Sequence, residues 1–153
     1  MKIGEASETL GLSVQTIRFY EREGLVRAHR NQAGTRYFTE EDLIRLKVIR
    51  DLVQLGIPLS TLRNLTEIRQ HSRTGDQASH RVNDELAELA ARLSEQRAAI
   101  ERALEDIAAS TRFISNCYDC RVRPMRSTCD ACPVSAGLDR AEINHLIWDQ
   151  DDE

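Results

Sequence analysis

The chain has 153 residues, of which 30% are charged and only 5% are aromatic. This length allows one modest domain or two small ones, and the low aromatic content argues against one large hydrophobic core. No apolar run approaches the roughly 20 residues that a membrane-spanning helix needs, and the N-terminus lacks the apolar core of a signal peptide. We therefore expect a cytoplasmic protein with no membrane partner.

Charge is distributed unevenly along the chain, whose net charge is −4. Residues 1–73 carry twelve Lys and Arg against nine Asp and Glu, a net charge of +3. Residues 74–153 carry nine against sixteen, a net charge of −7. A basic N-terminal part joined to an acidic remainder is compatible with nucleic-acid binding by the first part.

The first residues predict two short helices joined by a tight turn. Apolar residues at helical spacing begin at Ile3, and Gly11 is suited to end that helix. Ser13 is a good N-cap for a second helix, which should run to about Glu23 and stop at Gly24. Two helices joined by a few residues that include glycine are typical of a helix-turn-helix.

A β-hairpin and two further helices are expected next. The β-prone segments 25–27 and 35–38 flank a polar tip at residues 29–34, which predicts a hairpin of the kind called a wing. Thr39, followed by three acidic residues, should cap a helix, and Pro58 should open another. Residues 1–70 are thus predicted to form a winged helix-turn-helix DNA-binding domain within a mainly α-helical protein.

After a polar hinge at residues 71–76, residues 77–115 show the longest periodic pattern. Apolar positions alternate steps of four and three, as in the seam of a coiled coil. Because one exposed helix cannot bury such a stripe alone, we expect a homodimer; the alternative is packing against its own domain. The seam consists of Val82, Leu86, Leu89, Leu93, Gln96, Ile100, Ala103 and Ile107.

All four cysteines lie in the predicted loop 116–138, as two C-x-x-C pairs separated by eight residues: Cys117, Cys120, Cys129 and Cys132. Four thiolates suit a tetrahedral zinc ion, another thiophilic ion or an iron–sulfur cluster. Metal-free thiol redox switching and disulfides remain alternatives. Arginines between the pairs should lower the thiol pKa values. In residues 139–153, Asp139 is expected to cap a short terminal helix that is followed by an acidic tail.

The second helix of a helix-turn-helix enters the major groove, and a wing can grip flanking phosphates. Ile17, Phe19 and Phe38 are instead expected in the core. The sequence contains no Ser/His/Asp set, phosphate-binding glycine loop or H-E-x-x-H pair, so we do not expect an enzyme. The candidate DNA-binding residues are Val14, Gln15, Thr16, Arg18 and Tyr20 on the helix, and Arg30, Arg36 and Tyr37 on the wing.

Three segments resemble the MerR family of bacterial transcription regulators: residues 17–25 (IRFYEREGL), Arg36-Tyr37 and residues 55–59 (LGIPL). The resemblance implies a homodimer with an antiparallel coiled coil that binds promoter DNA with an overlong spacer. With its effector bound, such a regulator distorts the DNA so that RNA polymerase engages both promoter elements. By position, Arg18, Tyr20, Arg36 and Tyr37 match residues that usually contact DNA in relatives.

The resemblance leaves the effector open. Metal sensors of the family use cysteines in the loop after the dimer helix, which implies zinc or another thiophilic ion. The SoxR branch holds a [2Fe–2S] cluster with four cysteines in this region, but spaced C-x-x-C-x-C-x5-C. Here the spacing is C-x-x-C-x8-C-x-x-C. A purely structural zinc with another effector is the remaining alternative.

Overall fold

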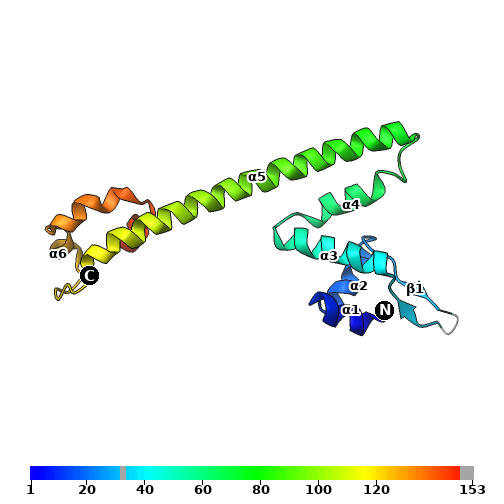
Figure 1. Ribbon diagram of the computed structural model, residues 1–153, viewed down its shortest axis with the longest axis horizontal. Helices are drawn as coiled ribbons and strands as arrows, with labels where there is room; N and C mark the ends of the chain where they lie inside the picture. The colour runs from blue at the N-terminus through cyan, green and yellow to red at the C-terminus, as the bar shows by residue number, and fades with distance from the viewer. Residues whose placement is uncertain (32–33, 149–153) are drawn as a thin grey trace. The chain divides into compact units, whose positions relative to one another are not determined.

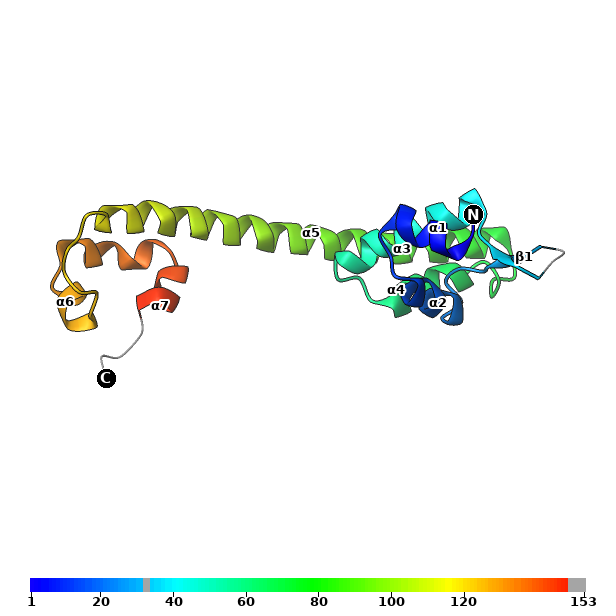
Figure 2. The same cartoon turned by 90° about the horizontal axis from the view of Figure 1, so that it is seen from below.

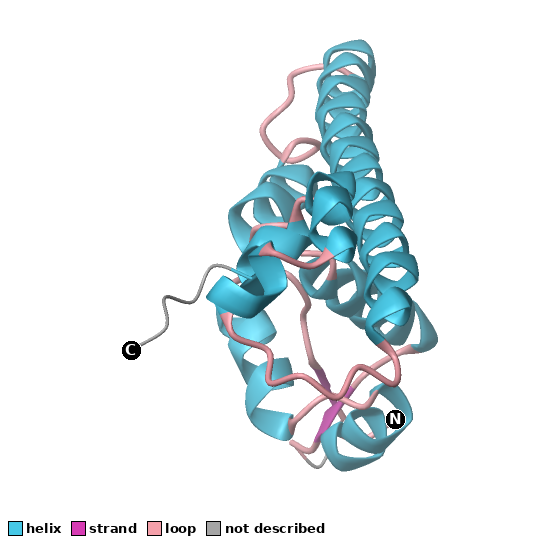
Figure 3. Cartoon of the chain, turned by 90° about the vertical axis from the view of Figure 1, so that its left-hand side faces the viewer, coloured by secondary structure: helices cyan, strands magenta, loops and turns pink. Residues whose placement is uncertain are grey.

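The computed structural model describes residues 1–31 and 34–148 (Figure 1). Two residues of the predicted wing tip, Gln32 and Ala33, and the predicted acidic tail, residues 149–153, lie outside the described residues. The chain divides into two compact units, Met1–Ala91 and a second that begins at Arg92. Helices dominate both units, and the only strands in the described ranges form one short hairpin (Figure 3).

The first unit begins with the predicted helix-turn-helix, α1 (Ile3–Leu10) and α2 (Val14–Arg22). Gly11 ends α1 with φ 63°, a left-handed conformation that glycine adopts without a Cβ clash. The hydroxyl of Ser13 accepts a hydrogen bond from the Thr16 amide at 2.9 Å and so caps α2. The predicted turn chemistry is therefore confirmed at both helix ends.

The wing differs from the prediction in its first arm. Its strands are β1 (His29–Arg30) and β2 (Arg36–Tyr37), antiparallel, with His29 opposite Tyr37. The expected first arm was residues 25–27, but Leu25 and Val26 are 0% and 2% exposed and belong to the core. Burial of this apolar pair leaves the residues after it, which were predicted as part of the tip, to form the strand.

Two helices complete the packing of the first unit, α3 (Glu40–Gln54) and α4 (Leu59–Glu67) (Figure 2). Thr39 and Asp42 form a reciprocal capping box at the start of α3. Leu46 of α3 is completely buried, as Phe38 nearly is at 1% exposure. Because α1 contacts both α2 and α3, this core holds the helix-turn-helix in place.

The long helix α5 covers Gly75–Ile114, 40 residues, and so begins inside the predicted hinge. Its N-terminal residues belong to the first unit and its remainder to the second. Large apolar side chains stay exposed along it: Leu86, Ile100, Leu104 and Ile107. Leu104 is a member of this set that the predicted seam did not include.

The second unit contains more helix than the predicted loop. After η1 (Ser115–Cys117) come α6 (Arg126–Asp130), the 3-10 helix η2 (Pro133–Arg140) and α7 (Ile143–Trp148). The predicted loop 116–138 thus contains the start of η2, which continues to Arg140. Pro133 occupies the first helical position, where the missing N–H would have had no intrahelical partner.

The cap of α7 also differs from the prediction. The carboxylate of Asp106, on α5, accepts hydrogen bonds from the backbone amides of Glu142 and Ile143 at 2.7 and 2.8 Å. The residue expected to provide this cap, Asp139, instead lies 3.3 Å from His145. A long-range contact to α5 has therefore replaced the expected local cap.

Among the described residues, no helix combines the length and the apolar character required to cross a membrane.

Candidate functional site

The exposed start of α2 carries four of the predicted DNA-binding residues. Gln15 and Arg18 are exposed and lie three residues apart, so they share one face of the helix. Val14 and Thr16 are half-buried, and the Thr16 hydroxyl lies 2.8 Å from that of Ser13. Gln15 and Arg18 are therefore the two side chains of this set that are most free to reach a base edge or a phosphate.

Two arginines from later helices hold the ends of the helix-turn-helix. Arg50 of α3 donates to the Leu10 carbonyl at the end of α1 at 2.6 Å. Arg63 of α4 pairs with the Glu23 carboxylate and also donates to the Glu23 carbonyl at 3.3 Å. Both contacts join residues 40 positions apart and satisfy groups at helix C-termini. They restrict how α2 can tilt relative to its support.

The wing presents its three predicted residues at the surface. Arg30 donates to the Gly34 carbonyl at 3.0 Å, and Tyr37 packs against His29 with ring centroids 5.5 Å apart. Arg36 lies 3.8 Å from the carboxylate of Glu21, which connects the wing to α2. Each guanidinium keeps further N–H groups for phosphate oxygens, because its donors outnumber these single contacts.

Two neighbouring aromatic residues of α2 differ from the prediction. Tyr20, a predicted DNA contact, is only 4% exposed, and burial raises the pKa of its hydroxyl. Only a small edge of Tyr20 can therefore touch DNA. Phe19, which we expected in the core, is 36% exposed, and the Arg22 guanidinium lies 5.8 Å from its ring centroid. Ile17 and Phe38 are buried as expected.

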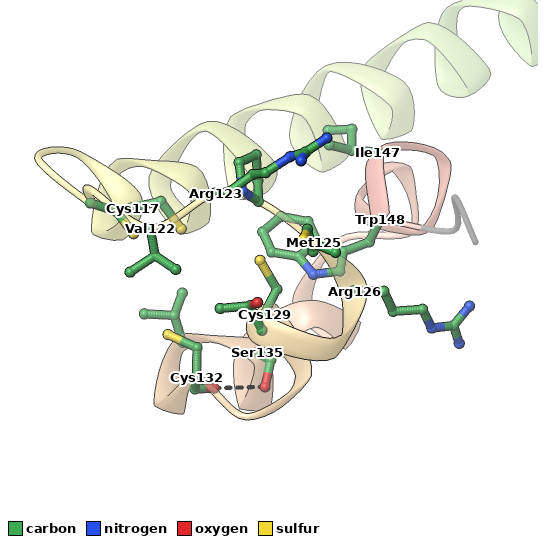
Figure 4. Close-up of a pocket in the computed structure, with 14 residues that line it drawn as sticks. Cys117, Val122, Arg123, Met125, Arg126, Cys129, Cys132, Ser135, Ile147 and Trp148 are labelled. Atoms are coloured by element: carbon green, nitrogen blue, oxygen red, sulfur yellow. Dashed lines mark hydrogen bonds between the residues drawn. The ribbon is translucent and has the colours of Figure 1, made fainter. Parts of the chain in front are cut away.

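In the second unit, all four cysteines line one cavity of about 510 Å³ (Figure 4). Cys117 and Cys120 approach it from η1 and the loop that follows, and Cys129 and Cys132 from α6 and the start of η2. The structure thus brings together the two C-x-x-C pairs. The rest of the wall is mostly apolar and includes Val122, Pro124, Met125, Val134, Ile147 and Trp148.

The other three thiols affect the protonation of Cys117. Burial raises the pKa of the Cys117 thiol, and negative charge on Cys132, Cys120 and Cys129 raises it further. Arg123 and Arg126 line the same cavity. The expected lowering of the thiol pKa by the arginines is therefore wrong for Cys117, where desolvation and the other three thiols prevail.

The donor set fits a thiophilic ion by type, since four sulfur ligands are what zinc or an iron–sulfur cluster takes from a protein. In the part of the chain that the structure describes, no three or more His, Cys, Asp or Glu side chains are grouped closely enough to hold an ion as they stand. Zn–S bonds are about 2.3 Å long, so binding requires the four thiols to move inward.

Comparison with known proteins identifies the family. The sequence model of the family described as MerR HTH family regulatory protein matches residues 1–67. These residues contain the helix-turn-helix, the wing, α3 and α4. The transcriptional regulator ZntR of Escherichia coli K12 is 35% identical over 107 residues, which cover 68% of this chain and 75% of ZntR. The chain belongs to the MerR family of transcriptional regulators.

Two further MerR relatives are informative. The heavy metal-dependent transcription regulator 2 of Rhizobium meliloti is 33% identical over 91 residues, which cover 58% of this chain and 62% of that protein. The crystal structure of HiNmlR, a MerR family regulator lacking the sensor domain and bound to promoter DNA, has a TM-score of 0.66. It is 26% identical to this chain, and the match covers 76% of this chain and 90% of HiNmlR.

Membership in the MerR family confirms the resemblance found in the sequence and the predicted fold. This fold is mainly helical, with a winged helix-turn-helix, a long helix and four C-terminal cysteines. Its matched relatives are regulators rather than enzymes. Sequence reasoning missed the residues that line the thiol cavity, above all Met125 and Trp148. One signal was available, because Trp148 is the only tryptophan of the chain and closes the helix that follows the cysteines.

Proposed function

We propose that this MerR protein binds and distorts promoter DNA as a homodimer and responds to a thiophilic metal ion, zinc first, held by its four cysteines. In this proposal residues 1–70 bind DNA, 71–76 act as a hinge, 77–115 dimerise and 116–138 hold the ligand, while 139–153 form a terminal segment. The observation that carries the effector assignment is the convergence of all four thiols on one cavity.

The DNA-binding part of the proposal rests on α2 and the wing. The side chains of Gln15 and Arg18 are exposed near the start of α2. The two wing arginines extend this basic surface from α2 to the wing. The match to the DNA-bound HiNmlR structure supports the same use of this fold. The eight residues proposed to contact DNA remain those predicted, with Tyr20 limited to its exposed edge: Val14, Gln15, Thr16, Arg18, Tyr20, Arg30, Arg36 and Tyr37.

The DNA contact is tested with Arg18→Ala in a fluorescence-anisotropy titration of promoter fragments. Loss of one good base or phosphate contact should weaken binding roughly tenfold or more. The wild-type affinity should fall steeply as salt rises, since phosphate contacts release counterions. The control is Arg92→Ala, because Arg92 is an exposed residue of α5. This variant should bind as the wild type does. Equal affinity of Arg18→Ala and wild type would remove Arg18 from the proposed interface.

The dimer part of the proposal rests on exposed apolar surface. Ile100 and Leu104 of α5 are 59% and 61% exposed in the single chain. Leaving such side chains in water is unfavourable, and a second α5 would cover them. A dimer also supplies two α2 helices for a near-palindromic operator. RNA polymerase at the same promoter is the proposed downstream partner.

The effector is identified by purifying the protein without oxygen, recording its visible spectrum and counting metal per chain. We expect a colourless protein with one zinc per chain, because four thiolates satisfy tetrahedral zinc. A red-brown protein with iron and labile sulfide would establish the SoxR-like alternative instead. A zinc-loaded protein whose DNA complex does not respond to zinc would reduce the metal to a structural role.

The ligand set is tested with Cys120→Ser. If all four cysteines hold one ion, this variant should lose stoichiometric zinc, because a three-thiolate site is incomplete. Ser115→Ala, beside the cavity but outside its lining, is the control and should retain one zinc. Partial retention by Cys120→Ser would indicate two half-sites, and full retention would exclude Cys120 from the ligand set.

A further inference from the structure

The thiol cavity contains a polar group that the four-cysteine proposal does not use. The indole Nε1 of Trp148 is buried and, within the described residues, is the side-chain nitrogen or oxygen found buried with no hydrogen-bond partner. Trp148 also lines the cavity with the four cysteines. An indole N–H is a donor only, so what it lacks is an acceptor.

The position of the indole is fixed by contacts between α7 and α5. Asp106 caps α7, and the fully buried Asn144 accepts a hydrogen bond from Ser110 at 2.6 Å and donates to the Leu138 carbonyl at 2.8 Å. Phe113, only 5% exposed, packs against Trp148 with ring centroids 5.6 Å apart. These contacts join α7 to α5 and set the position of the indole at the cavity wall.

Sulfur is the acceptor that this cavity is equipped to supply. The Ser135 hydroxyl donates its proton to the Cys132 carbonyl at 2.7 Å, and its oxygen remains a neutral acceptor. In Figure 4, Cys129 and the Trp148 indole lie on the same side of the cavity. A neutral thiol is a weak acceptor, whereas a thiolate bound to a cation carries charge and accepts a stronger, charge-assisted hydrogen bond.

We propose that Trp148 is a positioning residue of the thiol site, whose indole N–H donates to the Cys129 thiolate when a thiophilic cation is bound. This inference rests on the proposed function. The N–H···S bond gives the buried donor its partner and withdraws negative charge from a sulfur-rich site. Groups that hydrogen-bond to metal ligands in this way orient them and strengthen metal binding.

The wild-type protein provides the direct measurement, because its only tryptophan gives a single indole N–H resonance. With ¹⁵N-labelled full-length protein, one equivalent of Cd²⁺ or Zn²⁺ should move this resonance downfield and slow the exchange of its proton with water. A resonance whose position and exchange rate do not change in the metal-loaded protein would overturn the proposal.

The matched variant is Trp148→Phe, which keeps an aromatic ring against Phe113 but removes the donor. Zinc affinity, measured by competition with a chromophoric chelator, should fall roughly tenfold, as expected on losing a hydrogen bond to a charged group. Tyr118→Phe is the control: Tyr118 is 72% exposed and lies outside the cavity lining, so the affinity should not change.

The outcomes separate this inference from the proposed function. If the wild type binds metal and Trp148→Phe binds it equally well, only the role of Trp148 is wrong. If the wild type binds neither ion, both the metal site and the role of Trp148 are wrong. If Trp148→Phe loses its helical circular dichroism, the wild-type indole resonance decides alone.

Discussion

At the scale of single residues, the second unit depends on a few close contacts around Phe113. Gly137 is buried, and a Cβ at this position would come within 3.1 Å of the Phe113 ring. Because Phe113 in turn packs on Trp148, the absence of a side chain at residue 137 is what lets η2 approach α5 and the indole together.

Gly137→Ala should therefore destabilise the second unit by about 1–3 kcal/mol, the usual cost of overpacking a filled core. The fluorescence of Trp148, the only tryptophan, reports the unfolding of this unit during chemical denaturation. Gly4→Ala is the control, because no heavy atom lies within 4 Å of its Cβ and the position is helical. It should be neutral or stabilise the protein by up to about 1 kcal/mol. Equal midpoints for Gly137→Ala and wild type would show that Phe113 can yield without cost.

At the scale of elements, local signals predicted the first unit well and the second unit poorly. Gly11 and Ser13 act on neighbouring backbone groups, so the turn of the helix-turn-helix can be predicted from adjacent residues. The cap of α7 comes from Asp106, 36 positions earlier, and no local pattern indicates it. The prediction of the first wing arm was wrong for a related reason. Leu25 and Val26 are β-prone, but both are buried in the tertiary core.

The Thr39–Asp42 capping box fixes the start of α3 through two local hydrogen bonds. The Thr39 hydroxyl accepts from the Asp42 amide at 3.2 Å, and the Asp42 carboxylate accepts from the Thr39 amide at 2.8 Å. His29 of β1 also lies 3.2 Å from that carboxylate, so the box connects the wing to α3.

Thr39→Ala should lower the free energy of unfolding of the first unit by about 0.5–2 kcal/mol, the range measured for lost N-caps. Ser60→Ala, at an exposed position in the first turn of α4, is the matched control and should change it by less than about 0.5 kcal/mol. Far-ultraviolet circular dichroism during urea unfolding measures both. A Thr39→Ala midpoint equal to that of Ser60→Ala would mean that Asp42 and His29 hold the start of α3 without the hydroxyl.

At the scale of the whole molecule, the cysteine motif and the apolar periodicity indicated where the thiols and the long helix lie. They did not indicate which other residues line the thiol cavity. The C-x-x-C pairs predicted a shared site because four thiols recur within a short stretch, and the cavity contains all four. Its apolar wall comes from residues whose spacing carries no such pattern, such as Met125 and Ile147. Met125 lies between the two pairs in the sequence, whereas Ile147 is brought to the cavity by the folding of the chain after α5.

The long helix makes a prediction that belongs to the assembly. Ile100 is exposed in the single chain and lies in the predicted seam, so a charge there would lie within the proposed dimer interface. Ile100→Asp should shift the protein from dimer to monomer in sedimentation equilibrium. Its affinity for a near-palindromic promoter should fall by roughly a hundredfold or more, because one α2 helix then replaces two at the operator.

Ala91→Asp introduces the same charge at an exposed position of α5 outside the seam, so it should leave both the dimer and the DNA affinity unchanged. This pair of variants separates a specific interface from a general effect of added acid on DNA binding. If Ile100→Asp remained dimeric, the seam would lie elsewhere on α5, and Leu104, equally exposed but outside the predicted set, would be the next position to test. If both variants became monomeric, the helix would dimerise through a wider face than the predicted seam.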